Sequence, residues 1–190
     1  MRLARFILCL WLAVAAPFTS VFAQDKPAAP SGNWAGRQFG DVQIETPFEF
    51  KEFPDVISNV PAAVRERIDS MHTFLGGTEG TFIVFVTSTT YKPGITLSLD
   101  GALKGIINGG AAKVGDSDPQ YTSQSIKLSG LDARRASYQK VMADGRAIHM
   151  EVMAVVRGQA LYQVQGLYFG DTAKTDVERV MASIAIKAAP

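Results

Sequence analysis

The sequence predicts an α+β fold, with a central antiparallel β-sheet flanked by helices. Apolar side chains recur at the two-residue period of a β-strand over three successive stretches, residues 132–142, 146–156 and 161–169. Directly after them, residues 172–183 form an amphipathic helix, whose apolar stripe consists of Val177, Val180, Met181 and Ile184. Strands that follow one another closely pair antiparallel, and a helix with one apolar stripe packs on a sheet.

Two turns separate the three strands. Asp144-Gly145 is typical of a tight hairpin, and Gly158 supplies the second turn. In the middle strand, one face is entirely apolar and consists of Ile148, Met150, Val152, Ala154 and Val156. We expect the terminal helix to close over this face. Thr175 and Glu178 fit a capping box, so the helix could also begin one turn later than residue 172.

Residues 1–23 have the pattern of a secretory signal. A basic start with Arg2 and Arg5 is followed by an apolar run over residues 6–16 and a small-residue cleavage site ending at Ala23. The run is shorter than the roughly 20 apolar residues that span a bilayer, although an uncleaved anchor remains the alternative. We therefore expect a periplasmic or secreted protein, cleaved after Ala23, without stable membrane insertion.

Composition excludes several functions. Cys9, the only cysteine, lies within the apolar run and not at a lipoprotein processing site, so the mature chain would have no disulfide, thiol nucleophile or cysteine zinc site. Loss of Arg2 and Arg5 would take the formal net charge from +1 to −1. A near-neutral chain without a basic run has no electrostatic drive to bind nucleic acid. We expect no cofactor.

After the signal, residues 24–38 are expected to be a flexible linker and residues 39–187 a single domain. Short strands are predicted at residues 42–45 and 48–53, broken at Pro47, so that they lie at a sheet edge or turn a corner.

The next stretch has two interpretations. The side chains at Val60, Val64, Ile68, Met71 and Leu75 fit one helical face that would end at Gly76-Gly77. A strand over residues 65–75, with a hairpin through residues 76–80, fits the following element better.

Residues 81–91 have apolar side chains on both sides of the chain, which predicts a central strand that is covered on both faces. A helix is then predicted over residues 99–108, capped by Ser98 or Asp100 and stopped by Gly109-Gly110. Residues 115–120 form a polar loop, and residues 125–128 lead into the three C-terminal strands.

Several phrases resemble the PsbP-like family of α/β/α sandwich proteins, which includes DcrB-like bacterial envelope proteins. They are Ile44-Glu45-Thr46-Pro47, Leu99-Asp100-Gly101-Ala102, Leu128-Ser129-Gly130-Leu131-Asp132-Ala133-Arg134 and Leu161-Tyr162-Gln163-Val164. The resemblance covers residues 42–186 and implies an antiparallel sheet with helices on both faces, with a strand at residues 65–75. Most members act by binding or assembly, and no family catalytic residue carries over. A fold likeness does not transfer function.

The candidate chemistry centres on His149 and Glu151, which lie two apart on one strand and share a face. The neighbours that could share this face are Arg135, Ser137, Gln139, Gln163 and Gln165. A histidine with a carboxylate could begin a metal site, but a site needs three or four ligands. A metal-binding protein or metal-dependent hydrolase is therefore the alternative function. His72 is the only other histidine.

Three other patterns favour structural interpretations. Ser137 and Lys140 match a Ser-x-x-Lys string, but on a strand they face opposite ways. Asp116 and Asp118 lack the remaining ligands of a calcium loop. The glycines between residues 101 and 115 are interpreted as helix ends rather than a phosphate loop.

We therefore expect a non-enzymatic accessory or interaction protein without catalytic, cofactor or metal residues. Its partner would be an envelope protein or a small ligand. Binding would depend on an exposed apolar patch, with Tyr162, Tyr168 and Phe169 as core or edge aromatics. A carrier of a small apolar ligand between helix and sheet is a further hypothesis.

Overall fold

The computed structural model describes residues 33–53, 56–78 and 81–188. The elements are β1 (Ala35–Phe39), β2 (Val42–Thr46), β3 (Phe50–Glu52), η2 (Val56–Asn59), α1 (Ala62–Arg65), β4 (Ile68–Thr78), β5 (Phe82–Tyr91), α2 (Leu99–Lys113), β6 (Tyr121–Leu128), β7 (Leu131–Val141), β8 (Ala147–Arg157), β9 (Ala160–Phe169), α3 (Gly170–Ser183) and β10 (Ala185–Ile186). The expected signal and its cleavage site lie outside the described residues, and so does Pro54. None of the helices described is both long and apolar enough to cross a membrane.

The strands form two sheets. The larger sheet has seven strands in the order β3-β4-β5-β9-β8-β7-β6, and every neighbouring pair is antiparallel. The smaller sheet has the order β1-β2-β10. The α+β class with a central antiparallel sheet is therefore confirmed.

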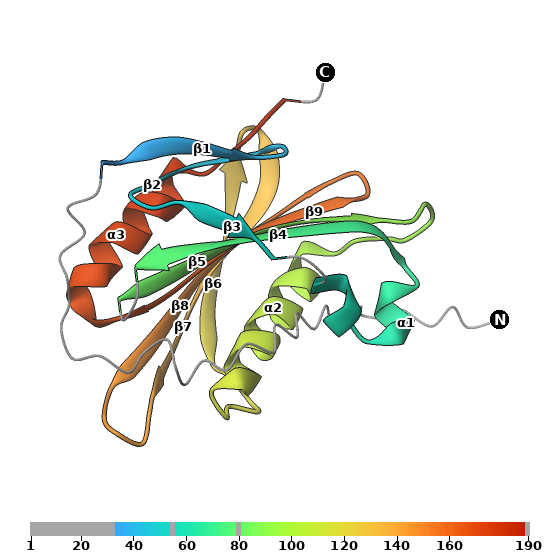
Figure 1. Ribbon diagram of the computed structural model, residues 1–190. Helices are drawn as coiled ribbons and strands as arrows, with labels where there is room; N and C mark the ends of the chain where they lie inside the picture. Colours follow the sequence, from blue (N-terminus) through green and yellow to red (C-terminus); the bar gives the residue numbers. More distant parts are fainter. Residues whose placement is uncertain (1–32, 54–55, 79–80, 189–190) are drawn as a thin grey trace.

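The two longer helices lie on opposite faces of the large sheet (Figure 1). The apolar face of β8, with Ile148, Met150 and Val152, is buried as expected, but it is α2 that covers it. The terminal helix α3 instead packs its stripe on the other face, between the large sheet and β2. The expectation that α3 closes over the apolar face was wrong. Two helices with an apolar face lie near β8 in the sequence, α2 before it and α3 after it. It is α2 that packs on this face of the sheet.

The three C-terminal strands follow the prediction within one residue at each end. Gly145 and Gly158 both have positive φ, 84° and 59°, which a residue with a Cβ adopts only with strain. In the second hairpin Arg157 pairs with Ala160, so only Gly158 and Gln159 form the loop.

The predicted stop of α2 at Gly109-Gly110 is wrong, because the helix continues to Lys113. A Cβ on Gly110 would lie 2.7 Å from the Met150 sulfur, so this glycine allows α2 to approach β8 closely. After Lys113, Gly115 turns the chain away from the helix with a φ of 72°. The backbone N–H of Asp116 then donates to the carbonyl of Ala111 at 3.0 Å. At the other end, the Ser98 hydroxyl accepts from the backbone N–H of Gly101, as a capping residue does.

The stretch over residues 60–77, which had a helical and a strand interpretation, forms the short helix α1 and then the strand β4. The strand interpretation is therefore confirmed. β4 continues through Gly76 and Gly77 to Thr78 instead of turning there. Both glycines are close-contact positions: a Cβ on Gly77 would lie 2.5 Å from the Phe82 carbonyl oxygen.

Helix α3 begins at Gly170, before the predicted start, so Thr175 and Glu178 lie within the helix and form no capping box. Gly170 has a φ of 74°, and this conformation redirects the chain from β9 into the helix.

The small sheet starts earlier than the expected domain. β1 begins at Ala35, inside the range expected as a linker. After β2 the chain passes Pro47 and enters the edge of the large sheet as β3, which agrees with the predicted corner.

A polar cluster fastens the small sheet to the β8–β9 hairpin. The Arg157 guanidinium is ion-paired with Asp41, donates to the Lys187 carbonyl at 2.6 Å and donates to the Tyr162 hydroxyl at 2.8 Å. Tyr162 in turn donates to Asp41 at 2.7 Å. The bond from Tyr162, followed by the charge of Arg157, holds the pKa of Asp41 below its usual 3.8.

Candidate functional site

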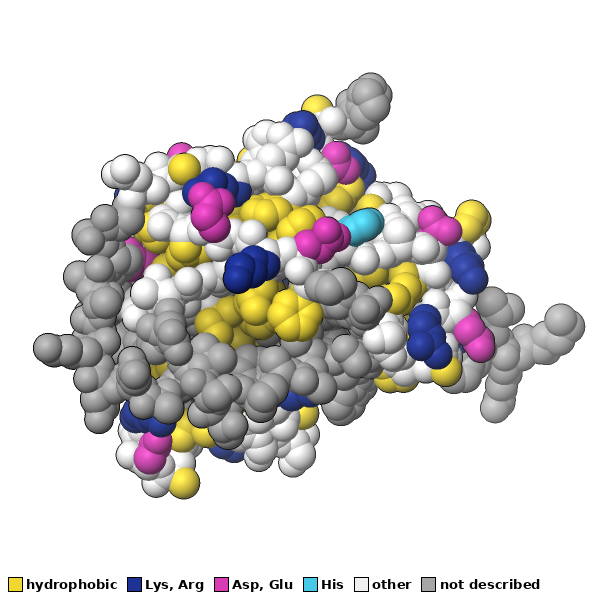
Figure 2. All heavy atoms as spheres, viewed as in Figure 1, with side chains coloured by type: hydrophobic (Ala, Val, Ile, Leu, Met, Phe, Trp, Pro, Cys, Tyr) yellow, Lys and Arg dark blue, Asp and Glu magenta, His cyan; other side chains and the backbone are white. Residues whose placement is uncertain are grey.

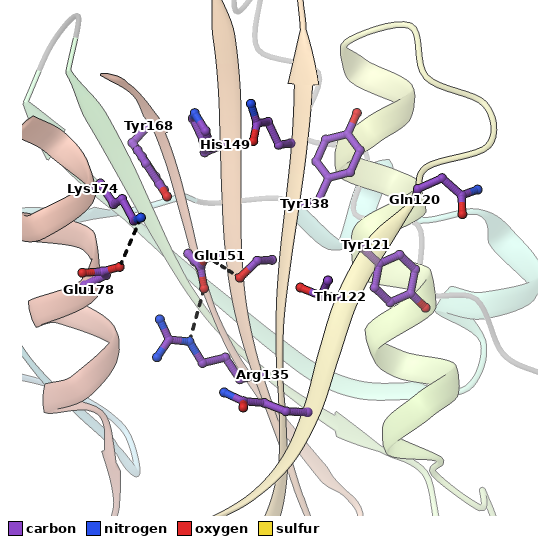
Figure 3. Close-up of a pocket in the computed structure, with 13 residues that line it drawn as sticks. Gln120, Tyr121, Thr122, Arg135, Tyr138, His149, Glu151, Tyr168, Lys174 and Glu178 are labelled. Carbon is purple, nitrogen blue, oxygen red and sulfur yellow. Dashed lines mark hydrogen bonds and ion pairs between the residues drawn. The ribbon is translucent and has the colours of Figure 1, made fainter. Parts of the chain in front are cut away.

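A polar groove of about 750 Å³ lies on the α3 side of the large sheet. Its floor is formed by β7 and β8, α3 forms one wall, and the edge strand β6 borders the opposite side (Figure 3). The lining residues carry mostly amide, hydroxyl or charged groups: Gln120, Tyr121, Thr122, Gln124, Arg135, Ser137, Tyr138, Gln139, His149, Glu151, Tyr168, Lys174 and Glu178. The candidate residues His149, Glu151, Arg135, Ser137 and Gln139 all lie here, as the sequence predicted.

Glu151 is the buried centre of the groove floor, with 8% of the residue exposed. One carboxylate oxygen accepts from the Ser137 hydroxyl at 2.5 Å, and the other accepts from Nε of Arg135 at 3.2 Å. Both donors come from β7, where Ser137 lies directly opposite Glu151. A buried carboxylate needs such donors and a cation to remain stable, so these bonds hold it in place.

His149 lies one step further along the same face of β8. Its ring stacks on Tyr168 of β9, with centroids 4.9 Å apart and planes inclined by 13°. Tyr168 is buried, whereas His149 is half-buried and presents its outer side to the groove (Figure 3). The pair gives the floor a flat aromatic surface, beside the exposed amide of Gln139.

The wall formed by α3 contributes a second ion pair. Nζ of Lys174 lies 3.9 Å from the Glu178 carboxylate one helical turn away, and both side chains are about half exposed. The groove therefore contains two cations and two carboxylates that are paired with each other. Apart from His149, its remaining polar lining consists of amide and hydroxyl groups.

Gln163 and Gln165 do not share this face, and that expectation was wrong. The two-residue turn at Gly158 sets His149 opposite Tyr168, which places both glutamines on the α2 side of β9. There Nε2 of Gln165 contacts the Met150 sulfur at 2.7 Å. Gln163 is buried, and its Oε1 has no hydrogen-bond partner within the described part of the chain.

The two histidines are far apart in the sheet. His72 lies on β4, three strands from β8, and contacts Glu52 at 3.1 Å on the exposed edge. Across residues 33–53, 56–78 and 81–188, no three His, Cys, Asp or Glu side chains converge as a metal site. Each oxygen of Glu151 already accepts one hydrogen bond within the protein, and His149 and Glu151 together offer fewer than the three or four ligands that a metal site needs.

The other sequence motifs take structural roles. Lys140 faces the α2 side, 3.9 Å from Asp116, whereas Ser137 faces the groove, so the Ser-x-x-Lys string makes no pair. Asp116 also accepts a hydrogen bond from Tyr138 at 2.9 Å. Burial, with this bond to Asp116, raises the pKa of the Tyr138 hydroxyl.

In the part of the chain that the structure describes, an exposed apolar patch of the expected kind is not seen. Among the described residues, Val141 is the only large hydrophobic side chain that is exposed, at 62%. Figure 2 shows hydrophobic side chains between scattered charges on one face, and near the β3 edge Phe48, Phe50 and Phe74 are half-buried against the core. Tyr162 and Tyr168 are buried, which confirms them as core aromatics.

Sequence reasoning missed the residues that border the groove on β6 and α3. Thr122 and Gln124 fall between the predicted loop at residues 115–120 and the segment at residues 125–128, where no element was predicted. They belong to β6, which pairs with β7 over its whole length. Lys174 and Glu178 were visible as an i, i+4 pair, but nothing in the sequence placed α3 on this face.

Comparison with known proteins supports the fold alone. No family model matches the chain, and no curated protein matches it in sequence. The solution structure of cyanobacterial PsbP (CyanoP) from Synechocystis sp. PCC 6803 is similar with a TM-score of 0.55 at 14% identity, over 81% of this chain and 92% of that chain.

Weaker likenesses are found in two other solved structures. A Bacteroides thetaiotaomicron protein matches with a TM-score of 0.44 at 10% identity, over 83% of this chain and 49% of its own. The Pseudomonas aeruginosa protein of unknown function PA94 matches with a TM-score of 0.40 at 12% identity, over 83% of this chain and 100% of its own. From the geometry and the first of these likenesses, the chain has a PsbP-like α+β fold.

Proposed function

We propose that this protein is an exported accessory protein that binds a partner in the polar groove and catalyses no reaction. The observation that carries this proposal is the pairing of the groove charges. Glu151 accepts from Ser137 and Arg135, and Glu178 pairs with Lys174.

A general base or a metal ligand needs a lone pair directed at the substrate or the ion. Each oxygen of Glu151 instead already accepts one hydrogen bond from a donor on β7, so fewer lone pairs remain for a substrate or an ion. A carboxylate held this way stabilises the floor and leaves the groove electrically balanced. Such a surface favours a partner that offers hydrogen-bonding groups rather than a strong net charge.

The lining supports the same interpretation. The amides of Gln124 and Gln139 can each donate and accept, and so can the hydroxyl of Thr122. His149 adds a flat ring against which an apolar part of a partner could pack. The partner class that fits is an envelope protein segment or a small ligand rich in hydroxyl or amide groups.

Export rests on the pattern of residues 1–23. N-terminal sequencing of the protein recovered from the producing cells tests it. We expect a chain that begins at Gln24 and is found in the periplasmic or secreted fraction. An intact Met1 in the membrane fraction would contradict export of a cleaved protein.

Binding is tested with two matched variants. Gln139→Arg places a cation on the groove floor, and Gln43→Arg places the same group on the exposed face of β2, away from the groove. We expect Gln139→Arg to lose an envelope protein or ligand that the wild type and Gln43→Arg both retain. The retained species is identified by mass spectrometry and its binding is then repeated with purified components. Equal retention by all three proteins would contradict a partner site in the groove.

A further inference from the structure

We propose that two copies of this chain pair antiparallel through β6, about a two-fold axis at Gln124, and that this pairing joins their grooves. The inference goes beyond the proposed function, because it concerns a second copy rather than the partner. It rests on the edge of the sheet and not on the chemistry of the groove floor.

The two edges of the large sheet differ. β3, at one edge, has three residues and so offers little backbone for pairing. β6, at the other, has eight residues that pair with β7 without a register shift. One side of its backbone faces outwards, because β6 is the last strand of this sheet among the residues that the structure describes. Edge strands that remain unpaired are usually short, or carry proline, bulges or charged side chains.

β6 has one of these protective features, the exposed Lys127, which is paired with Asp132 of the same hairpin at 2.8 Å. Its sequence contains no proline, and its pairing with β7 contains no bulge. Thr122, Ser123, Gln124 and Ser125 are exposed, and their side chains make no hydrogen bonds within the described part of the chain. The strand therefore presents both backbone and side-chain groups to another strand.

A second copy of β6 fits this edge in a defined register. Two-fold pairing must place residues of the same face opposite each other, since side chains alternate along a strand. With Gln124 on the axis, Thr122 lies opposite Ile126 and Ser123 opposite Ser125. Lys127 then lies opposite Tyr121, so that no two like charges meet. Amide, hydroxyl and β-branched pairs of this kind stabilise neighbouring strands.

Pairing about an axis perpendicular to the sheet keeps both grooves on one face. The floor would then run over β8, β7 and β6 of one copy and the same strands of the other, with an α3 helix along each side. Six strands at the usual spacing give a floor about 24 Å wide. The side of each groove that ends at β6 would therefore open into the groove of the second copy (Figure 3).

Single cysteines test the register directly. In a Cys9→Ser background, Gln124→Cys would be the only cysteine of the chain. Directly opposed residues in antiparallel strands have Cα atoms about 5 Å apart, within reach of a disulfide. We expect mild oxidation to give a cross-linked dimer at this position.

Ser125→Cys is the matched control, because it is equally an exposed position of β6. In the proposed register the two Ser125 positions are about 8 Å apart and cannot be bridged without movement of the backbone. Faster cross-linking at Gln124 than at Ser125 supports the proposal. Equal cross-linking, or a preference for Ser125, overturns it.

Sedimentation of the purified protein, without any partner, gives the second measurement. We expect a reversible dimer whose population rises with concentration, and at least a tenfold weaker association for Gln124→Lys, which opposes two ammonium groups. Gln124→Asn should associate like the wild type. A monomer at all concentrations up to ~1 mM overturns the proposal. In that case β6 would be open to pairing with a strand of another protein. Partner capture that depends on Gln139 would be unaffected by that result, so the two proposals fail separately.

Discussion

Ser137 and Glu151 lie directly opposite each other on β7 and β8, and the serine hydroxyl donates to the carboxylate at 2.5 Å. Replacement of Glu151 by Ala would leave this hydroxyl and the half-buried Arg135 guanidinium without their acceptor. We expect the free energy of unfolding to fall by about 1–3 kcal/mol, because unpaired buried donors keep their desolvation cost. Denaturant unfolding measures the change.

Glu178→Ala is the control for this change. Glu178 is on the α3 wall of the groove and is about half exposed, and exposed ion pairs contribute little. We expect a change within about 0.5 kcal/mol. If Glu151→Ala were as stable as Glu178→Ala, the structural role assigned to the Glu151 carboxylate would be wrong.

Gly77 lies within β4, where an added Cβ would be 2.5 Å from the backbone oxygen of Phe82. Since backbone atoms of a paired strand cannot move aside easily, we expect Gly77→Ala to destabilise the protein by about 1–3 kcal/mol. Gly36→Ala on β1 serves as the comparison, because no atom lies within 4 Å of its added Cβ. That variant should be neutral or slightly more stable in the same unfolding assay.

The cluster of Asp41, Arg157 and Tyr162 predicts a pH dependence of stability. The folded-state pKa of Asp41 lies below its ordinary 3.8, first through the bond from Tyr162 and then through the charge of Arg157. A lowered carboxyl pKa contributes stability above the ordinary pKa, and this contribution is lost as pH falls through the folded-state value. Asp41→Asn should therefore be less stable than the wild type near neutral pH.

The stability difference between the wild type and Asp41→Asn should be constant from neutrality to about pH 5 and should shrink below pH 3.8. Tyr162→Phe removes the largest cause of the lowered pKa, so it should move the loss of stability to higher pH. Unfolding curves recorded over this range check both statements. A difference that grew on acidification would contradict the assigned sign.

The metal-centred alternative is tested by elemental analysis of purified protein. Glu151 is occupied by Arg135 and Ser137, so we expect no stoichiometric transition metal and no change on His149→Ala. Stoichiometric metal in the wild type that is absent from His149→Ala would replace the binding proposal with a metal-dependent function.

The sequence was most informative where local chemistry alone determines structure. The strands at Leu131–Val141, Ala147–Arg157 and Ala160–Phe169 agree with the predicted ranges, because alternation and glycine turns both act over a few residues. The strand at Ile68–Thr78 was predicted with a helix as its alternative, since its apolar residues also fit one helical face.

Interactions between distant segments limited the prediction elsewhere. Gly110 resembles a helix stop until Met150 is seen packed against it. The glutamines Gln163 and Gln165 were misplaced because one residue more or less in the Gly158 turn reverses every side chain of β9. His149 and Glu151 were correctly placed on one face, since they lie two apart on one strand. Their grouping with three neighbours on β7 was also correct, because the hairpin at Gly145 sets Ser137 directly opposite Glu151.

Site-specific photo-cross-linking in the producing cells tests most directly whether the groove is a partner site. A photoreactive amino acid at position 139 lies on the groove floor, and the same amino acid at position 43 lies on the exposed face of β2. We expect position 139 to give a discrete cross-linked species that position 43 does not give. The same species at both positions, or none at position 139, would contradict the assignment of the groove as the binding surface.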